Sequence, residues 1–137
     1  MKRSIILFAL LIVVLAAAAA PVWAHHSFAA SYDMSKSITV QGTIVEVRLT
    51  NPHSWFFLDV KDPATGKVER WSFEAGTPGA MVRNGFKPTE IKAGTVVTIK
   101  GVHARDLSAN SGMLQQLTTA DGKVYGMFGP QEGAGAR

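Results

Sequence analysis

Alternating apolar and polar residues run through the middle of this chain and predict a succession of β-strands. In the first, from residue 37 or 38 to residue 49, Val45, Val47 and Leu49 share one face. Strand-like segments of the same kind follow at residues 55–60, 68–73, 95–103 and 113–119. The pair Asp121-Gly122 then predicts a tight hairpin into a last strand over 123–128. The pattern therefore indicates a mainly β domain.

One short helix interrupts the strands. Thr77 is suited to the N-cap, Pro78 to the first helical position and Gly85 to a left-handed stop. Three strands, a short helix and two or three further strands are the order of an OB-like Greek-key barrel of five or six strands. A plain β-sandwich is the alternative architecture, and the helix between strands three and four favours the barrel.

The two ends of the chain differ from this β pattern. Lys2 and Arg3, followed by an apolar run from Ile5 to Ala20 and by Ala24 before the expected cut, predict a bacterial signal peptide. An uncleaved membrane anchor is the alternative, although the run is shorter than the ~20 residues of a spanning helix. We expect a periplasmic or secreted protein that leaves the membrane after cleavage. Its predicted parts are a signal peptide over 1–24, an N-terminal arm over 25–37, the β domain over 38–128 and a disordered tail over 129–137.

Composition excludes several classes of function. The chain has no cysteine, which removes disulfides, thiolate metal sites and cysteine nucleophiles. Its 14 Lys and Arg against 10 Asp and Glu include two leader residues, and the rest are scattered, so nucleic acid is not an expected partner. There is no Gly-x-Ser-x-Gly elbow, phosphate loop or dinucleotide fingerprint. Because the acidic residues, Glu74 among them, fall near turns or on strand faces that look solvated, we expect a non-enzymatic binding or accessory protein.

The most specific candidate chemistry is at the mature N-terminus. Cleavage after Ala24 makes His25 the first residue and His26 the second. The free amine and the imidazole of an N-terminal histidine can chelate one metal ion, and nitrogen ligands in a square arrangement suit Cu(II) best. The terminal amine, with a reference pKa of about 7.7 to 8.0, loses its proton readily enough for this. We therefore expect copper at His25, with His26 as a substitute ligand; a flexible terminus without a ligand is the alternative.

Two further histidines complete the predicted metal site. His53 lies in the loop between strands one and two, and His103 ends strand four, so in an OB-like barrel both flank the same binding face. A straight first strand separates the arm from them by about 40 Å, and the arm extends by at most about 43 to 47 Å. The alternatives are that His53 stabilises its turn and that His103 is a buried, hydrogen-bonded imidazole.

A second hypothesis needs no metal. A barrel of this kind can bind a small ligand or a periplasmic partner protein through the same two loops, with Trp55 and Arg105 at the rim. Trp71 and Phe73 occupy alternate positions on one strand, which is typical of core residues.

Four short segments carry a family resemblance: His25-His26-Ser27-Phe28-Ala29, Gly42-Thr43-Ile44, Asn51-Pro52-His53-Ser54-Trp55 and Trp71-Ser72-Phe73-Glu74-Ala75-Gly76. With them the chain resembles domain of unknown function 6152, a family of small exported bacterial proteins. The resemblance covers nearly the whole mature domain, although the segment 105–110 is longer than the family pattern. The family has no established activity, so the resemblance implies the secretion signal and the domain boundaries and no catalytic residue.

Overall fold

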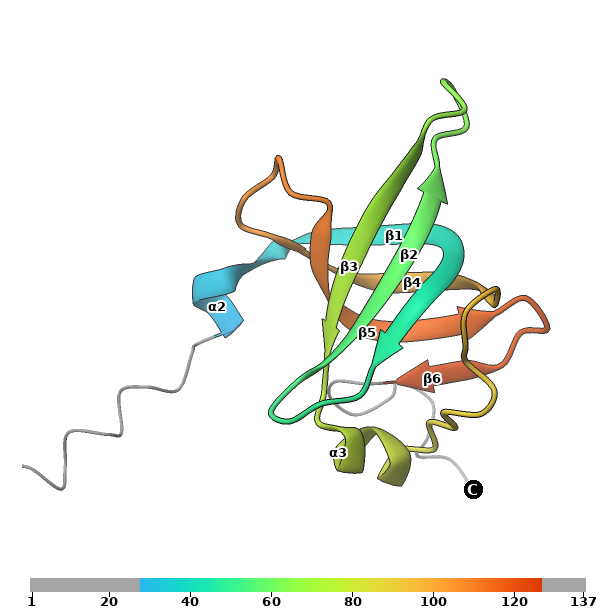
Figure 1. The fold of residues 1–137 in the computed structure, drawn as a ribbon. Coiled ribbons are helices and arrows are strands. Elements are labelled where there is room, and N and C mark those ends of the chain that lie inside the picture. Colours follow the sequence, from blue (N-terminus) through green and yellow to red (C-terminus); the bar gives the residue numbers. More distant parts are fainter. Residues whose placement is uncertain (1–27, 127–137) are drawn as a thin grey trace, which may run out of the picture.

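The computed structural model describes residues 28–126, and in them the prediction of a mainly β protein with a short helix before strand four is confirmed (Figure 1). Among these residues no helix has the length and apolar character needed to cross a membrane. The elements in chain order are α2 (Phe28–Ser31), β1 (Tyr32–Arg48), β2 (Ser54–Lys61), β3 (Val68–Ala75), α3 (Pro78–Arg83), β4 (Val96–Ala104), β5 (Ser111–Thr119) and β6 (Val124–Gly126).

The strands form one sheet in the order β3-β2-β1-β4-β5-β6, with neighbours antiparallel. β3 also pairs with β5 in parallel, from Ser72 to Glu74 on β3. This extra pairing joins the two sides of the sheet, so that β1 to β5 form a ring and β6 continues from β5 (Figure 1). We call the side of the strands that faces the middle of the ring the inner face.

The main core fills the ring because successive residues of a strand point to opposite faces. On the inner face are the fully buried side chains of Phe56, Leu58, Phe73, Ile99 and Leu117. A second, smaller cluster lies on the outer face and consists of Tyr32, Val102 and Met113. The face to which a side chain belongs therefore follows from its position along its strand.

α3 has the predicted boundaries. The Thr77 side chain accepts a hydrogen bond of 3.2 Å from the backbone N–H of Ala80, and Pro78 is the first helical residue. The helix ends before Gly85, whose φ of 90° is the left-handed conformation that favours glycine. Met81 is buried and fixes the helix against the core.

The N-terminal part of the β domain differs from the prediction. β1 begins at Tyr32 instead of residue 37 or 38, and α2 precedes it directly, so the end of the predicted arm has regular structure. The reason is a long-range pairing that no local period indicates: Tyr32 lies opposite Ala104, and the backbone N–H of Arg105 donates to Ser31 at 2.9 Å. A register shift between Tyr32 and Ser37 follows. The predicted leader, His25, His26 and the predicted tail lie outside the described residues.

Candidate binding site on the outer face

A mostly buried carboxylate lies on the outer face of β3 and connects three parts of the chain. Glu74 follows the inner-face residue Phe73, so its side chain points outward, yet only 13% of it is exposed. One carboxylate oxygen accepts a hydrogen bond from the Tyr32 hydroxyl, and the other contacts Nδ1 of His53. We call Tyr32, His53 and Glu74 the Glu74 cluster. It joins the start of β1, the loop before β2 and the end of β3.

The two contacts of Glu74 indicate which atoms of Tyr32 and His53 act as hydrogen-bond donors. Burial raises the pKa of Tyr32, and the hydrogen bond to Glu74 and the charge of Glu74 raise it further, so this hydroxyl remains a donor. An ionised carboxylate only accepts hydrogen bonds, so Nδ1 of His53 carries the proton in its contact with Glu74. In a neutral imidazole the lone pair then lies on Nε2. A carboxylate that orients the distal nitrogen of a histidine in this way is the usual partner of a metal-binding imidazole.

The N-terminal segment enters the structure beside the Glu74 cluster. Tyr32 is both the first residue of β1 and a member of the cluster, and α2 lies immediately before it (Figure 1). The chain from Tyr32 back to His25 can span at most about 25 Å. The long path expected for the arm, from the far end of a straight strand, is therefore not required.

His103 lies elsewhere. Its Nδ1 is 2.9 Å from the Ala104 carbonyl oxygen, and its ring meets Trp71 edge-on with centroids 5.7 Å apart. Trp71 stacks on Phe73, and both belong to the inner face of β3, whereas Glu74 belongs to the outer face.

His53 and His103 are therefore on opposite faces of β3, and the structure does not bring these two predicted ligands together. Among residues 28–126 no group of three or more His, Asp or Glu side chains is arranged to hold a metal ion.

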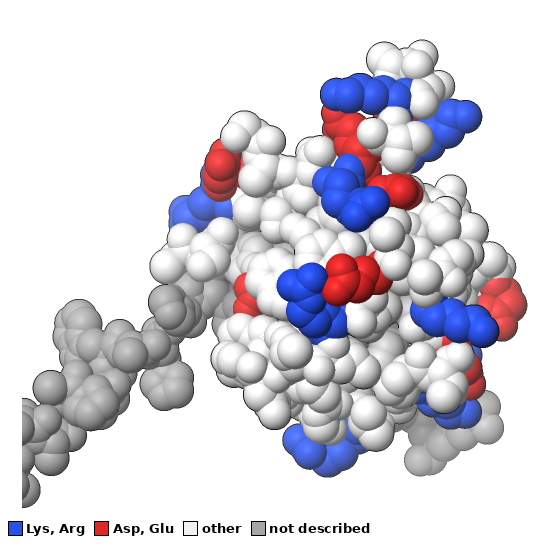
Figure 2. Space-filling model, viewed as in Figure 1, with Lys and Arg blue, Asp and Glu red and all other residues white. Residues whose placement is uncertain are grey.

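Half-buried aromatic residues extend the outer face across β2. Trp55 lies opposite Glu74 in the strand register and stacks with Phe57 at a centroid distance of 6.5 Å. The guanidinium of Arg48 lies 5.0 Å from the centroid of the Phe57 ring. We call Arg48, Trp55 and Phe57 the aromatic face. Charged side chains gather at the protruding β2–β3 hairpin, and much of the surface below that hairpin is uncharged (Figure 2).

The second predicted rim residue, Arg105, is exposed and adjoins the same outer face. Its backbone binds Ser31, next to Tyr32, and its charge contributes to lowering the pKa of the exposed Asp33, after the larger effect of hydrogen bonds from Ser35. Arg105 and Trp55 therefore border the Glu74 cluster from the side of α2 and from the side of β2.

The family model of domain of unknown function 6152, described as a family of unknown function, matches residues 12–113. The chain belongs to this family. The match contains the whole Glu74 cluster and the aromatic face, and the resemblance found in the sequence is thereby confirmed. Neither a curated protein nor a solved structure matches the chain.

Two members of the Glu74 cluster, Tyr32 and Glu74, are not among the site residues that the sequence predicts. The sequence predicts a solvated Glu74, because the acidic residues fall near turns or on strand faces that look solvated. In the structure Glu74 is shielded by Tyr32, which lies 42 residues earlier in a segment without a sustained period. The available signal is that Tyr32, like Phe28, is an aromatic residue in a stretch of mostly small and polar residues.

Proposed function

We propose that this chain is an exported, non-enzymatic binding protein that holds Cu(II) on the outer face of an OB-like barrel. The proposed ligands are the terminal amine and imidazole of His25, formed by cleavage after Ala24, and Nε2 of His53. His26 is the substitute ligand. His103 is left out of the set because it contacts the inner-face residue Trp71.

The orientation of His53 carries this proposal. Glu74 holds Nδ1 of the imidazole, and Tyr32 holds Glu74, so the ring has one fixed tautomer and little freedom to turn. Tyr32 also anchors the start of β1 beside His53, within reach of the segment that carries His25. Amine and imidazole nitrogens are the ligands that Cu(II) prefers, and a nearby carboxylate makes the coordinated imidazole a stronger donor.

The barrel is part of the same proposal. The support is the position of α3 between the third and fourth strands and the pairing of β3 with β5, which completes the ring. In such a fold the outer face of strands two and three, with the loop between strands one and two, is where ligands bind. His53 and the aromatic face lie there.

A second candidate function is favoured by the aromatic face itself. Trp55 and Phe57 present half-exposed stacked rings beside the Arg48 guanidinium, and Arg105 adds a cation near Tyr32. This surface suits a small ligand, or a periplasmic partner protein, with an aromatic and an anionic group. Replacing Trp55 by Ala would weaken binding of this kind and leave copper binding unchanged.

The test is a Cu(II) titration of the mature protein beginning at His25, followed by calorimetry or by the visible absorption of the bound ion. His53→Gln is compared with His103→Gln, a matched change at the other described histidine. We expect His53→Gln to weaken binding strongly and His103→Gln to leave it unchanged. Glu74→Gln should weaken binding by about 10 to 100-fold, because it removes the partner that orients the imidazole. Equal effects of the two histidine variants would contradict the proposal.

A further inference from the structure

A groove of about 590 Å³ lies between the β5–β6 hairpin and the segment that leads into β4. Val96, the first residue of β4, lines it, whereas Ala104, the last, lies opposite Tyr32. These two ends of β4 are about 26 Å apart, so the groove is separate from the Glu74 cluster. Its volume is within the range of small-molecule sites, roughly 300 to 1,000 Å³. We call it the Glu90 groove.

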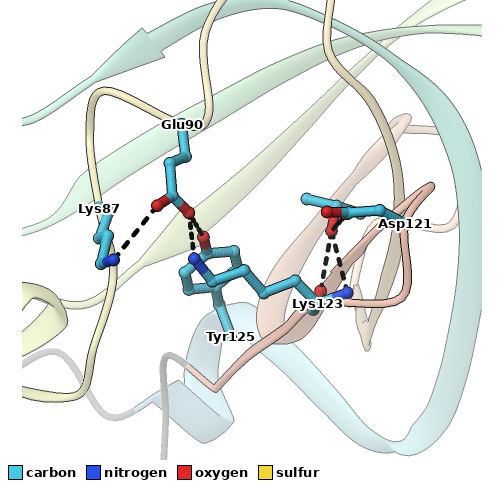
Figure 3. A network of polar contacts seen from close by, with 6 residues as sticks. Lys87, Glu90, Asp121, Lys123 and Tyr125 are labelled. Atoms are coloured by element: carbon cyan, nitrogen blue, oxygen red, sulfur yellow. Dashed lines mark hydrogen bonds and ion pairs between the residues drawn. The ribbon is translucent and has the colours of Figure 1, made fainter.

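The polar side chains of the Glu90 groove hold one another in place (Figure 3). One oxygen of Glu90 accepts from both the Tyr125 hydroxyl and the Lys123 ammonium, and the other lies 3.3 Å from Nζ of Lys87. The hydrogen bond from Lys123, then that from Tyr125, lowers the pKa of Glu90 to about 2, so this carboxylate is ionised throughout the physiological range. Fixed polar groups lose little entropy when a ligand binds them.

Two turns place the remaining lining groups. Gly94, with φ of 90°, ends the turn before Thr95, and Gly122, with φ of 86°, forms the predicted hairpin after Asp121. The hairpin closes through the N–H of Thr119, which donates to the Lys123 carbonyl at 2.9 Å. The turns therefore bring a hydroxyl and a second carboxylate to the edges of the groove.

The balance of charge in the Glu90 groove argues against an ionic ligand. The two carboxylates, Glu90 and Asp121, face the ammonium of Lys123 in the lining and that of Lys87 beside it. Because neither sign dominates, neither an isolated anion nor an isolated cation gains a large net attraction. Groups that both donate and accept hydrogen bonds match this lining better, since carboxylates only accept and ammonium groups only donate.

We propose that the Glu90 groove binds a neutral polyhydroxylated ligand the size of one or two sugar residues. Its hydroxyls would donate to Glu90 and Asp121 and exchange hydrogen bonds with Thr95, and its C–H surface would rest on Val96, whose side chain is exposed. This binding is independent of any metal at His53.

The experiment is NMR titration of the mature protein with glucose, galactose, N-acetylglucosamine and maltose, each at millimolar concentration. We expect at least one saccharide to shift backbone amides in residues 90–96 and 119–125 and to leave those around Glu74 unchanged. Asp121→Asn should weaken this binding about tenfold, which corresponds to about 1.4 kcal/mol.

Asp62→Asn is the matched control, because Asp62 also accepts hydrogen bonds in an exposed turn but lies between β2 and β3. It should leave saccharide binding unchanged, and thermal unfolding of both variants verifies that they are folded. The proposal is overturned if no saccharide shifts these amides, if inorganic phosphate or spermine shifts them instead, or if the two variants have equal effects.

Discussion

The Glu74 cluster and the Glu90 groove use the same arrangement at opposite ends of β4 and β5. In each, a carboxylate accepts a hydrogen bond from a tyrosine hydroxyl and contacts a basic side chain. They differ in burial and in the basic partner. The Glu74 side chain is 13% exposed and meets His53, whereas the Glu90 side chain is 38% exposed and meets Lys123 and Lys87.

The basic partner decides whether a region can exchange a proton or coordinate a metal near neutral pH. An imidazole exchanges its proton near neutral pH and can coordinate a metal through one nitrogen while the other stays hydrogen-bonded. A lysine ammonium keeps its charge at pH 7 and has no lone pair to offer. We therefore propose the metal ion at the Glu74 cluster and the neutral ligand at the Glu90 groove, where the charges are fixed.

The largest expected effect comes from comparing two glycines, one near each region. A Cβ at Gly101 would lie 2.2 Å from the Met113 carbonyl oxygen, in the strands that support Glu74, whereas a Cβ at Gly94 meets nothing within 4 Å. Gly101→Ala must displace backbone and should lower the free energy of unfolding by about 3 kcal/mol. Gly94→Ala should lower it by about 1 to 2 kcal/mol, through its positive φ alone.

Denaturant unfolding measures both glycine variants. Equal losses of unfolding free energy in the two variants would contradict the prediction, because the backbone contact at Gly101 would then cost no more than the positive φ at Gly94.

The next effect comes from removing each tyrosine hydroxyl. Tyr32→Phe leaves the mostly buried Glu74 carboxylate with His53 alone as a partner and should cost about 1 to 3 kcal/mol of folding stability. Tyr125→Phe should cost much less, because Glu90 is more exposed and keeps both lysines. Thermal unfolding of the two variants, one a control for the other, checks the order, and the reverse order would mean that burial does not distinguish the regions.

The smallest effects are in the pH dependence of stability, where the two regions act at opposite ends of the range. The pKa of Tyr32 is raised above its usual 10.0, so its stabilisation is complete below pH 10 and is lost as the pH rises further. The pKa of Glu90 is lowered from 4.5 to about 2, so its stabilisation is present above pH 4.5 and is lost as the pH falls toward 2.

Tyr32→Phe should therefore reduce the alkaline slope of the unfolding midpoint, and Glu90→Gln the acid slope. Other carboxylates with lowered pKa values, such as Asp62 and Asp121, keep part of the acid slope in Glu90→Gln. A change of the acid slope in Tyr32→Phe, or of the alkaline slope in Glu90→Gln, would contradict this assignment.

Local signals explain which parts of the fold were predictable. Caps and tight turns depend on a few neighbouring residues, so they can be predicted from the sequence. The ends of α3 follow from Thr77, Pro78 and Gly85, and the last hairpin follows from Asp121-Gly122. The start of β1 depends instead on the pairing of Tyr32 with Ala104, which only the assembled ring provides.

The candidate site was predictable in part for the same reason. His53 and Trp55 lie beside a turn that marks them as exposed, and both border the outer face. The loop position of His103 predicts the outer face, whereas the alternation of its strand favours the alternative of an imidazole turned to the apolar side. In the structure His103 follows outer-face Val102 and lies beside the inner-face residue Trp71. Glu74 was missed because its shielding comes from Tyr32, distant in the sequence.

The central claim is that a terminal histidine and His53 bind one Cu(II) ion together. The most direct test compares Cu(II) affinity of the chain that begins at His25 with that of the same chain carrying one extra alanine before it. The extension leaves all described residues unchanged and removes only the chelate formed by the amine and imidazole of one residue. The account predicts that affinity falls by orders of magnitude. Equal affinity of the two chains would contradict it.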